Sequence, residues 1–247
     1  MQSITILSGH NKLGQPEGFS SLTLNSGELY TIVGNTGSGK SRLIKDIEQL
    51  ACGDSVSGRK ILLNNKPVPL EKRQEYAAHL IAHLGQNMRF VLDATVEDFL
   101  LLHSRCRQKD ISVTQVLHLA NHITPESIRK EQKLNQLSGG QTRALMIADI
   151  ALICDSPIVL IDEIENAGID KETAFLHLSR QDKLVLVVTH DPHTALMAKK
   201  RIVLKKGGIC ALCERTPKEK EIYRQLDQTY KLHQQYQNLL RKGETLL

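Results

Sequence analysis

The sequence predicts an α/β fold whose centre is a mostly parallel β-sheet. The first observation is Gly34–Ser41, which reads G-x-x-x-x-G-K-S between a strand-like apolar run and a helical run. The second is a pair of unbroken apolar runs, Ile158–Ile161 and Leu184–Val188, each typical of a parallel strand buried on both faces. The third is that both runs end in polar residues, at the edge where open parallel sheets bind ligands.

The length, net charge and composition of the chain exclude several classes of protein. Its 247 residues suit one large α/β domain with an appended piece. The net charge of +5 is spread along the chain, so we expect no nucleic-acid partner. No stretch approaches the roughly 18 apolar residues of a membrane span, and the N-terminus lacks the features of a signal peptide. Five scattered cysteines indicate a reducing, cytoplasmic setting rather than a disulfide scaffold.

Gly34–Ser41 has the pattern of a phosphate-binding loop (P-loop). The segments on both sides of it are expected to be β-structure. Residues 3–33 alternate or run apolar and predict an N-terminal antiparallel β subdomain. Residues 60–68 predict a hairpin that turns at Asn64-Asn65. Residues 79–84 predict a further strand, which ends just before Gln86.

Residues 87–155 are predicted to form an inserted α-helical subdomain, because no strand pattern appears before its last helix ends. A capping box at Thr95–Asp98 starts one helix, and Val113–Ala120 has the period of another. Thr124-Pro125-Glu126 predicts an additional helix start, with proline in the first turn.

The C-terminal part of the sequence returns to an α/β pattern and then becomes a long, polar, helical segment. Lys171–Leu178 is expected to be helical, and residues 201–212 to form a hairpin. Residues 214–247 predict a helical extension beyond a domain of residues 1–213. It either docks on its own domain or offers a partner site, through an apolar face made of Ile222, Leu226, Tyr230, His233 and Leu240.

The P-loop predicts a nucleotide site. Its glycines let the backbone N–H groups point inward, where they and the positive end of the next helix hold phosphate oxygens. Lys40 is expected to reach the β and γ phosphates, and the Ser41 hydroxyl to bind Mg²⁺. The predicted binding residues are Gly34, Asn35, Thr36, Gly37, Ser38, Gly39, Lys40 and Ser41.

Polar residues that follow the buried strands are expected to converge on Lys40. Asp162 closes one strand in the Walker B pattern, whose carboxylate holds Mg²⁺. The next residue, Glu163, is placed to act as general base on a water. His190 follows the other strand and is expected to contact the γ-phosphate or that water.

A second anion-binding surface stands at the start of the helix that follows Leu137. It combines a hydroxyl, free N–H groups and the positive end of a helix dipole, from Ser138, Gly139, Gly140 and Gln141. A nucleotide already wrapped by the P-loop hardly needs another such surface from the same chain.

Taken together, these motifs resemble those of the ATP-binding cassette (ABC) ATPases. In the order of that family, the chain has a Walker A motif at Gly34–Ser41, a Q-loop at Gln86, the LSGGQ signature at Leu137–Gln141, a Walker B motif at Ile158–Glu163 and a switch histidine at His190.

The resemblance implies a P-loop NTPase core and a head-to-tail dimer with a second copy or a paralogous ABC subunit. Each ATP would lie between the Walker A motif of one chain and Ser138–Gln141 of the other. It also implies Mg-ATP hydrolysis, with Glu163 as base, Gln86 touching Mg²⁺ and the attacking water, and His190 contacting the γ-phosphate.

The chain departs from the usual pattern of this family in four places. Ile164–Asp170 is longer than the usual D-loop, with Asp170 matching the D-loop aspartate that contacts the nucleotide site. Thr142-Arg143-Ala144 replaces a glutamine- and arginine-rich run. No aromatic residue for stacking on adenine is obvious, and His10 is the candidate by spacing. Cys210-x-x-Cys213 is either half of a metal or redox site, or two strand residues without a ligand.

Two functions follow from the resemblance. The first is the energising subunit of a membrane transporter, bound through integral membrane permease chains to the inner face of the cell membrane. The alternative is a soluble ABC ATPase for metal-centre or protein-complex assembly, which the altered D-loop, the cysteine pair and the C-terminal helix favour.

Overall fold

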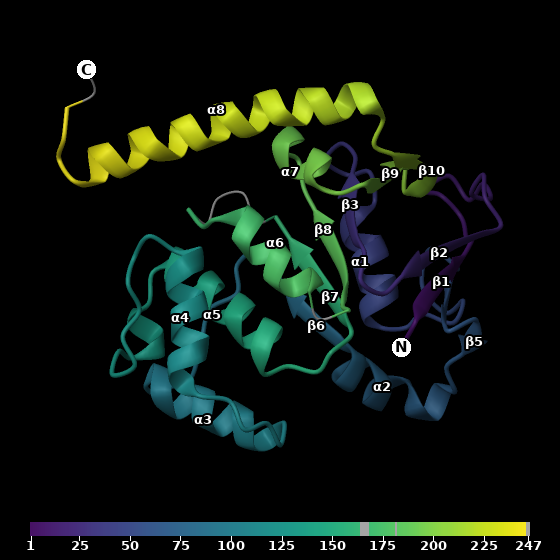
Figure 1. The fold of residues 1–247 in the computed structure, drawn as a ribbon. Helices are drawn as coiled ribbons and strands as arrows, with labels where there is room; N and C mark the ends of the chain where they lie inside the picture. The colour runs from purple at the N-terminus through teal and green to yellow at the C-terminus, as the bar shows by residue number, and fades with distance from the viewer. Residues whose placement is uncertain (164–167, 181, 246–247) are drawn as a thin grey trace.

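The computed structural model describes residues 1–163, 168–180 and 182–245. Within these residues, a six-stranded sheet runs in the order β10-β9-β3-β8-β7-β6 (Figure 1). Every neighbouring pair is parallel except β10 with β9. The predicted α/β fold with a mostly parallel sheet is therefore confirmed. The strands are β3 (Leu29–Val33), β6 (Ile81–Leu84), β7 (Ile158–Asp162), β8 (Leu184–Val188), β9 (Lys200–Lys205) and β10 (Gly208–Glu214).

The parallel register brings the ends of four strands to one edge of this sheet. Ile32 pairs with Val188, Asp162 pairs with Val188 from the other side, and Leu84 pairs with Ile161. The segments that follow β3, β6, β7 and β8 therefore start side by side, which is where the sequence motifs lie.

The two central strands are buried on both faces and separate two hydrophobic clusters. Ile158 and Leu160 of β7 belong to one cluster, which also contains α1 (Lys40–Glu48). Val159 and Ile161 point the other way, into the cluster formed with the helical segment. This alternation follows from the period of two in a strand and explains the unbroken apolar runs.

The N-terminal residues form a separate four-stranded antiparallel sheet, in the order β2-β1-β4-β5. Its strands are β1 (Ser3–Leu7), β2 (Ser21–Asn25), β4 (Lys60–Leu63) and β5 (Lys66–Pro67). The hairpin between the last two turns at Asn64 and Asn65 as predicted, and both have positive φ.

A buried ion cluster ties this sheet to the P-loop helix. The fully buried Arg59 guanidinium donates to Glu17 at 2.7 Å and to Asp46 of α1 at 2.9 Å. A further hydrogen bond, of 3.0 Å, runs from Arg59 to the carbonyl of Gly207 in the β9–β10 turn. The charges are paired and hydrogen-bonded, which is what makes their burial tolerable.

The helices cover both faces of the main sheet (Figure 1). The capping box predicted at Thr95 forms, and Ser138 forms a second capping box with Gln141. After α1 the helices are α2 (Arg73–Leu80), α3 (Val96–Cys106), α4 (Val113–Ile123), α5 (Gly139–Leu152), α6 (Lys171–Ser179), α7 (Pro192–Met197) and α8 (Pro217–Arg241). Among the described residues, no helix is long and apolar enough to cross a bilayer.

The helix expected to start at Thr124 does not form, and that prediction is wrong. Thr124 instead caps the C-terminus of α4. The Asn121 side chain accepts from the N–H of Ile128 at 2.7 Å and donates to its carbonyl at 3.1 Å. These bonds fold the following residues back as a loop, and tertiary contacts override the local preference of the Thr-Pro-Glu sequence.

Candidate functional site

A cavity of about 450 Å³ opens at the carboxyl edge of the main sheet. It gathers residues that the sequence motifs single out from four separate segments. These are Thr36, Gly37, Gly39, Lys40 and Ser41 of the P-loop, Gln86 after β6, Asp162 and Glu163 at the end of β7, and His190 after β8.

The P-loop backbone needs glycine at two places in particular. Gly39 has φ +103°, and a Cβ there would lie 2.8 Å from Cα of Gly207. Gly34 has φ +154°, and its Cβ would lie 2.6 Å from the carbonyl oxygen of Leu204. A side chain at either position would push the loop away from β9 and its turn. Ser38 Oγ is buried, and the described residues offer it no hydrogen-bond partner.

The Lys40 ammonium is held across the mouth of the loop. It donates to the carbonyl oxygen of Gly34 at 2.8 Å and to that of Asn35 at 3.3 Å. Burial lowers its pKa, while the carboxylates of Glu163 and Asp162 act in the opposite direction. A phosphate anion in the cavity would add charge that favours the ammonium form.

Glu163 has an unusual backbone at the point where β7 ends. Its φ is +47°, a region that residues other than glycine rarely adopt. Its N–H donates to the Val188 carbonyl at 3.1 Å. Its carboxylate accepts from the Gln86 amide and lies 3.3 Å from Nε2 of His190. The structure thus brings the expected base together with two other predicted site residues.

Arg143 of α5 holds the backbone of the segments that carry Glu163 and Gln86. The sequence did not reveal this role. Its guanidinium donates to the carbonyl oxygen of Glu163 at 2.9 Å and also to that of Gln86. One side chain therefore joins the helical segment to the backbone of two segments that line the cavity.

The second predicted anion-binding surface is not part of this cavity. Ser138 is the N-cap of α5, its Oγ accepting from the N–H of Gln141 at 3.2 Å. The same hydroxyl donates to the Glu126 carboxylate at 2.5 Å. Gly139 and Gly140 form the first turn of the helix, and a Cβ at Gly139 would meet nothing within 4 Å. None of these four predicted residues lines the cavity that contains Lys40.

Asp170, the predicted D-loop aspartate, also lies outside that cavity. It is the N-cap of α6, where its carboxylate accepts from the N–H of Thr173 at 3.1 Å. Residues 164–167 of the lengthened D-loop lie outside the described residues. Asp170 lines a different and larger cavity, of about 700 Å³, that lies between the end of α4 and α8.

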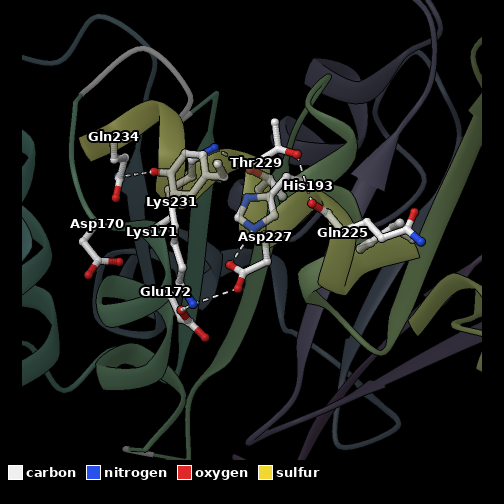
Figure 2. A network of polar contacts seen from close by, with 12 residues as sticks. Asp170, Lys171, Glu172, His193, Gln225, Asp227, Thr229, Lys231 and Gln234 are labelled. Carbon is white, nitrogen blue, oxygen red and sulfur yellow. Dashed lines mark hydrogen bonds and ion pairs between the residues drawn. The ribbon is translucent and has the colours of Figure 1, made fainter. Parts of the chain in front are cut away.

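Helix α8 docks on its own chain beside these loops and crosses over α7 (Figure 1). The buried His193 of α7 stacks on Tyr230 and Tyr223, with ring centroids 4.6 and 5.4 Å apart. Its Nε2 lies 3.3 Å from the Asp227 carboxylate. Figure 2 shows the His193 ring and this carboxylate facing each other. Thus the docked face of α8 contains Tyr223, Asp227 and Tyr230, whereas Ile222 and Leu240 of the expected face are exposed.

Tyr230 also connects α8 to the segment before α6. Its hydroxyl donates to the Ile169 carbonyl at 3.2 Å, and the Lys171 ammonium lies 4.8 Å from its ring centroid. Burial, together with the charges of Asp170 and Asp191, raises the pKa of Tyr230 to about 12. The hydroxyl therefore stays protonated and remains a donor at physiological pH.

Two candidates from the sequence are not brought to the site. His10 does not line the nucleotide cavity, and its ring lies against Gly58. Cys210 is exposed and Cys213 is half-buried, three residues apart on β10, whose pairing with β9 shifts register at Cys210. No group of three or more metal-ligating side chains occurs among the residues that the structure describes.

The cavity contains three cations that no sequence motif indicated: Lys12, Arg42 and Lys45. Arg42 and Lys45 follow the P-loop in α1, so the helical period alone could have predicted that they lie near the cavity. Lys12 belongs to the loop after β1, and no local pattern places it there.

Known proteins similar to this chain have the same kind of domain. The family model described as ABC transporter matches residues 19–166. An uncharacterized ABC transporter ATP-binding protein of Methanocaldococcus jannaschii is 48% identical over 248 residues, covering 100% of this chain and 95% of that protein. The macrolide export ATP-binding/permease protein MacB 1 of Yersinia pestis is 30% identical over 210 residues. That match covers 77% of this chain and 30% of the relative.

Solved structures show the same fold at lower identity. The cbiO1 protein of Clostridium perfringens, part of the ABC transporter complex cbiONQ, has a TM-score of 0.64 at 21% identity, covering 94% of this chain and 95% of that chain. A dimeric ATP-binding cassette in a post-hydrolysis state, bound to ADP and Pi, has a TM-score of 0.62 at 23% identity, covering 85% and 98%. The sequence and the fold of the present chain together establish that it belongs to the ABC transporter family and is an ATPase.

Proposed function

We propose that this ATPase binds Mg-ATP in the 450 Å³ cavity, dimerises head-to-tail around two ATP molecules and powers a membrane permease. The observation that carries the proposal is the separation of two anion-binding surfaces in one chain. The P-loop lines the cavity, while Ser138–Gln141 start α5 elsewhere and reach no nucleotide held by their own chain. A second copy, or a paralogous ABC subunit, brings the missing surface.

The residues of the cavity suit a magnesium nucleotide. Ser41 and Gln86 offer neutral oxygens and Asp162 a carboxylate, the hard donors that Mg²⁺ prefers, with the remaining ligands coming from phosphate and water. When bound, Mg²⁺ would offset the negative charge of the phosphates. Lys40 and the N–H groups of the P-loop hold the β and γ phosphates.

In the proposed reaction a water attacks the γ-phosphorus and the bond to the β-phosphate oxygen breaks, which leaves ADP and phosphate. The Glu163 carboxylate takes the proton of the water. Gln86 and His190, which already contact that carboxylate, orient the base and the water. Asp170 approaches the nucleotide of the partner from the D-loop side.

An exposed apolar surface beside Gln86 supports a permease partner. Val91 is 95% exposed, and Met88, Leu92 and Leu102 are also among the exposed large hydrophobic side chains. Exposed apolar side chains that gather on one surface mark binding sites, and we propose that these four contribute to one. In MacB proteins the ATP-binding and permease parts share one chain, and the proposal for this chain is that it binds integral membrane permease chains from the cytoplasmic face of the membrane.

The division of the chain belongs to the same proposal. Residues 1–213 form the cassette, with the helical subdomain at about 87–155, and residues 214–247 form the extension. The alternative is an ATPase for metal-centre or protein-complex assembly, to which Cys210 and Cys213 of β10 would contribute.

Dimer formation tests the proposal directly. Ser138→Arg places a long cation where the γ-phosphate of the partner's ATP would lie, so light scattering should show monomers in ATP, while the affinity for ATP changes little. A dimer of normal stability in this variant would contradict the sandwich. Native co-purification separates the partners: an integral membrane protein supports transport, and a soluble client protein supports assembly.

A further inference from the structure

Lys171, the first residue of α6, is a buried lysine that lies outside the functional motifs of the sequence. Only 4% of its surface is exposed. Its ammonium donates to Oδ2 of Asp191 at 2.8 Å and to Oγ1 of Thr194 at 2.9 Å. The ring of Tyr230 covers it from the side of α8, with the ring centroid 4.8 Å from Nζ. Because a buried ammonium needs such partners, its position depends on α7 and α8 as well as on α6.

Each partner of this ion pair directly follows a predicted site residue. Lys171 comes after Asp170, which is the N-cap of α6 and accepts from the N–H of Thr173 at 3.1 Å. Asp191 comes after His190 and is the N-cap of α7. One ion pair therefore joins the start of two helices, and it lies one peptide bond away from both Asp170 and His190.

Helix α8 contacts both of the segments that the ion pair joins. The Tyr230 hydroxyl donates to the carbonyl oxygen of Ile169, just before the D-loop aspartate. The same ring stacks on His193 of α7, with the ring centroids 4.6 Å apart. Figure 2 shows the Lys171 and His193 side chains within this single polar network. The ring also shields the ammonium from water, which strengthens its attraction to the Asp191 carboxylate.

The burial of this ion pair distinguishes it from its neighbour on the surface. The side chains of Lys171 and Asp191 are 5% and 27% exposed. Those of Lys231 and Glu172 are 56% and 57% exposed, and their charged atoms lie 3.6 Å apart. An exposed pair contributes little, whereas separating a buried pair leaves an uncompensated charge. Only the first pair is therefore expected to hold its two segments together.

We propose that Lys171 is a positioning residue for ATP hydrolysis, and that its ion pair with Asp191, covered by Tyr230, keeps Asp170 and His190 in a fixed arrangement. The proposal rests on the proposed function, which places Asp170 and His190 at the nucleotides. Lys171 does not line the nucleotide cavity, so it acts through the backbone of its neighbours. Its loss should therefore slow turnover and leave the affinity for ATP unchanged.

The experiment compares Lys171→Met, Asp191→Asn and the double variant in the full chain. Methionine keeps most of the length of lysine, and asparagine keeps an oxygen that caps α7, so each removes mainly the charge. We expect kcat for Mg-ATP to fall about tenfold in each single variant, with KM within about twofold of the native value. The double variant should be no slower than either, because the same ion pair is lost in all three.

Phosphate release gives kcat and KM, and circular dichroism shows whether each variant is folded. If Lys171→Met does not fold, Asp191→Asn makes the same comparison, because it retains the cap of α7. Native kcat in a folded single variant would overturn the inference. A rise in KM without a fall in kcat would overturn it as well, since the ion pair would then act on binding. Losses that add in the double variant would show two independent roles, contrary to the proposal.

Lys183→Met is the matched control. Lys183 is 5% exposed and donates to the carbonyl oxygens of Cys154 and Ser156. It precedes β8, at the opposite end of that strand from His190. Its loss should lower stability and leave kcat unchanged. The same fall in kcat as in the ion-pair variants would show that loss of any buried lysine slows turnover, and would overturn the inference.

The outcome for the proposed function is read separately. Loss of turnover in Glu163→Gln together with native rates in both ion-pair variants would overturn the positioning role alone. A native chain that hydrolyses no Mg-ATP would overturn the proposed function itself, and the positioning role with it.

Discussion

Nε2 of His190 lies 3.3 Å from Oε1 of Glu163. The two residues follow different strands, and the parallel pairing of β7 with β8 brings them together. The Gln86 amide donates to the other oxygen of the same carboxylate. The proposed base is thus held by two side chains that also face the cavity, so its position depends on three segments at once.

Glu163→Gln should lower kcat about 10²- to 10³-fold, because the amide cannot take the proton of the attacking water. The affinity for ATP should remain, and the ATP-bound dimer should accumulate. Phosphate release and size-exclusion chromatography in Mg-ATP measure the two effects. Glu71→Gln, at an exposed position before α2, is the control. Normal turnover in Glu163→Gln would assign the base to another group.

Arg143→Gln should lower kcat about tenfold and change KM little, because Arg143 positions the Gln86 and Glu163 backbones but contacts no substrate. Arg143→Lys keeps a single donor and should recover part of the rate. Steady-state kinetics check this against Arg129→Gln, an exposed position. If KM rises while kcat is unchanged, Arg143 acts on binding instead.

Glu126→Ala should strengthen ATP-dependent dimerisation. In the single chain the Glu126 carboxylate accepts from the Ser138 hydroxyl, and it would repel the γ-phosphate that this hydroxyl is proposed to bind. The protein concentration at half-dimerisation in ATP should fall about threefold or more, measured by light scattering. Glu131→Ala, nearby and exposed, should have no effect. A weaker dimer would mean that Glu126 holds Ser138 in its binding position.

Tyr230→Ala should lower the free energy of unfolding by about 2 kcal/mol, because it removes a half-buried ring from the stack with His193 and a hydrogen bond to Ile169. Tyr230→Phe keeps the ring and should cost about 1 kcal/mol. Urea denaturation measures both. Tyr236→Ala, on the exposed side of α8, should change stability by less than either. Equal values for the two alanine variants would show that the docking of α8 is not a stabilising contact.

The ion pair between Asp191 and Lys171 is expected to break in acid. Burial disfavours the charged form of Asp191, but hydrogen bonds from Lys171 and Thr194 outweigh burial and lower its pKa to about 2. Because the folded pKa lies below the unfolded value of about 3.9, the stabilisation is complete above about pH 5 and is lost progressively as the pH falls through 4 towards 2. Urea titrations between pH 5 and 2 should show this loss in the native protein and a smaller loss in Asp191→Asn. The same slope in both would exclude Asp191 as its source.

The fold was largely predictable because its signals are local. Buried strands, the capping box at Thr95 and the glycine pattern of the P-loop each depend on neighbours in sequence. The contacts of Arg143 and Lys12 were not predictable, since each joins segments far apart in the chain without any periodic pattern. The docked face of α8 was predicted only in part, since Tyr230 docks but Ile222 and Leu240 are exposed. Its partner His193 is a polar residue that is only 4% exposed, and no apolar pattern indicates it.

The alternation of side chains along β7 and β8 has a consequence for the thermal unfolding of the protein. Each of these strands supplies one wall of both hydrophobic cores, so neither core can lose its packing while the other keeps it. The cassette should therefore show one heat-absorption peak in calorimetry rather than two. Nucleotide bound at the ends of these strands would raise the temperature of that single transition, which makes thermal shift a measure of occupancy.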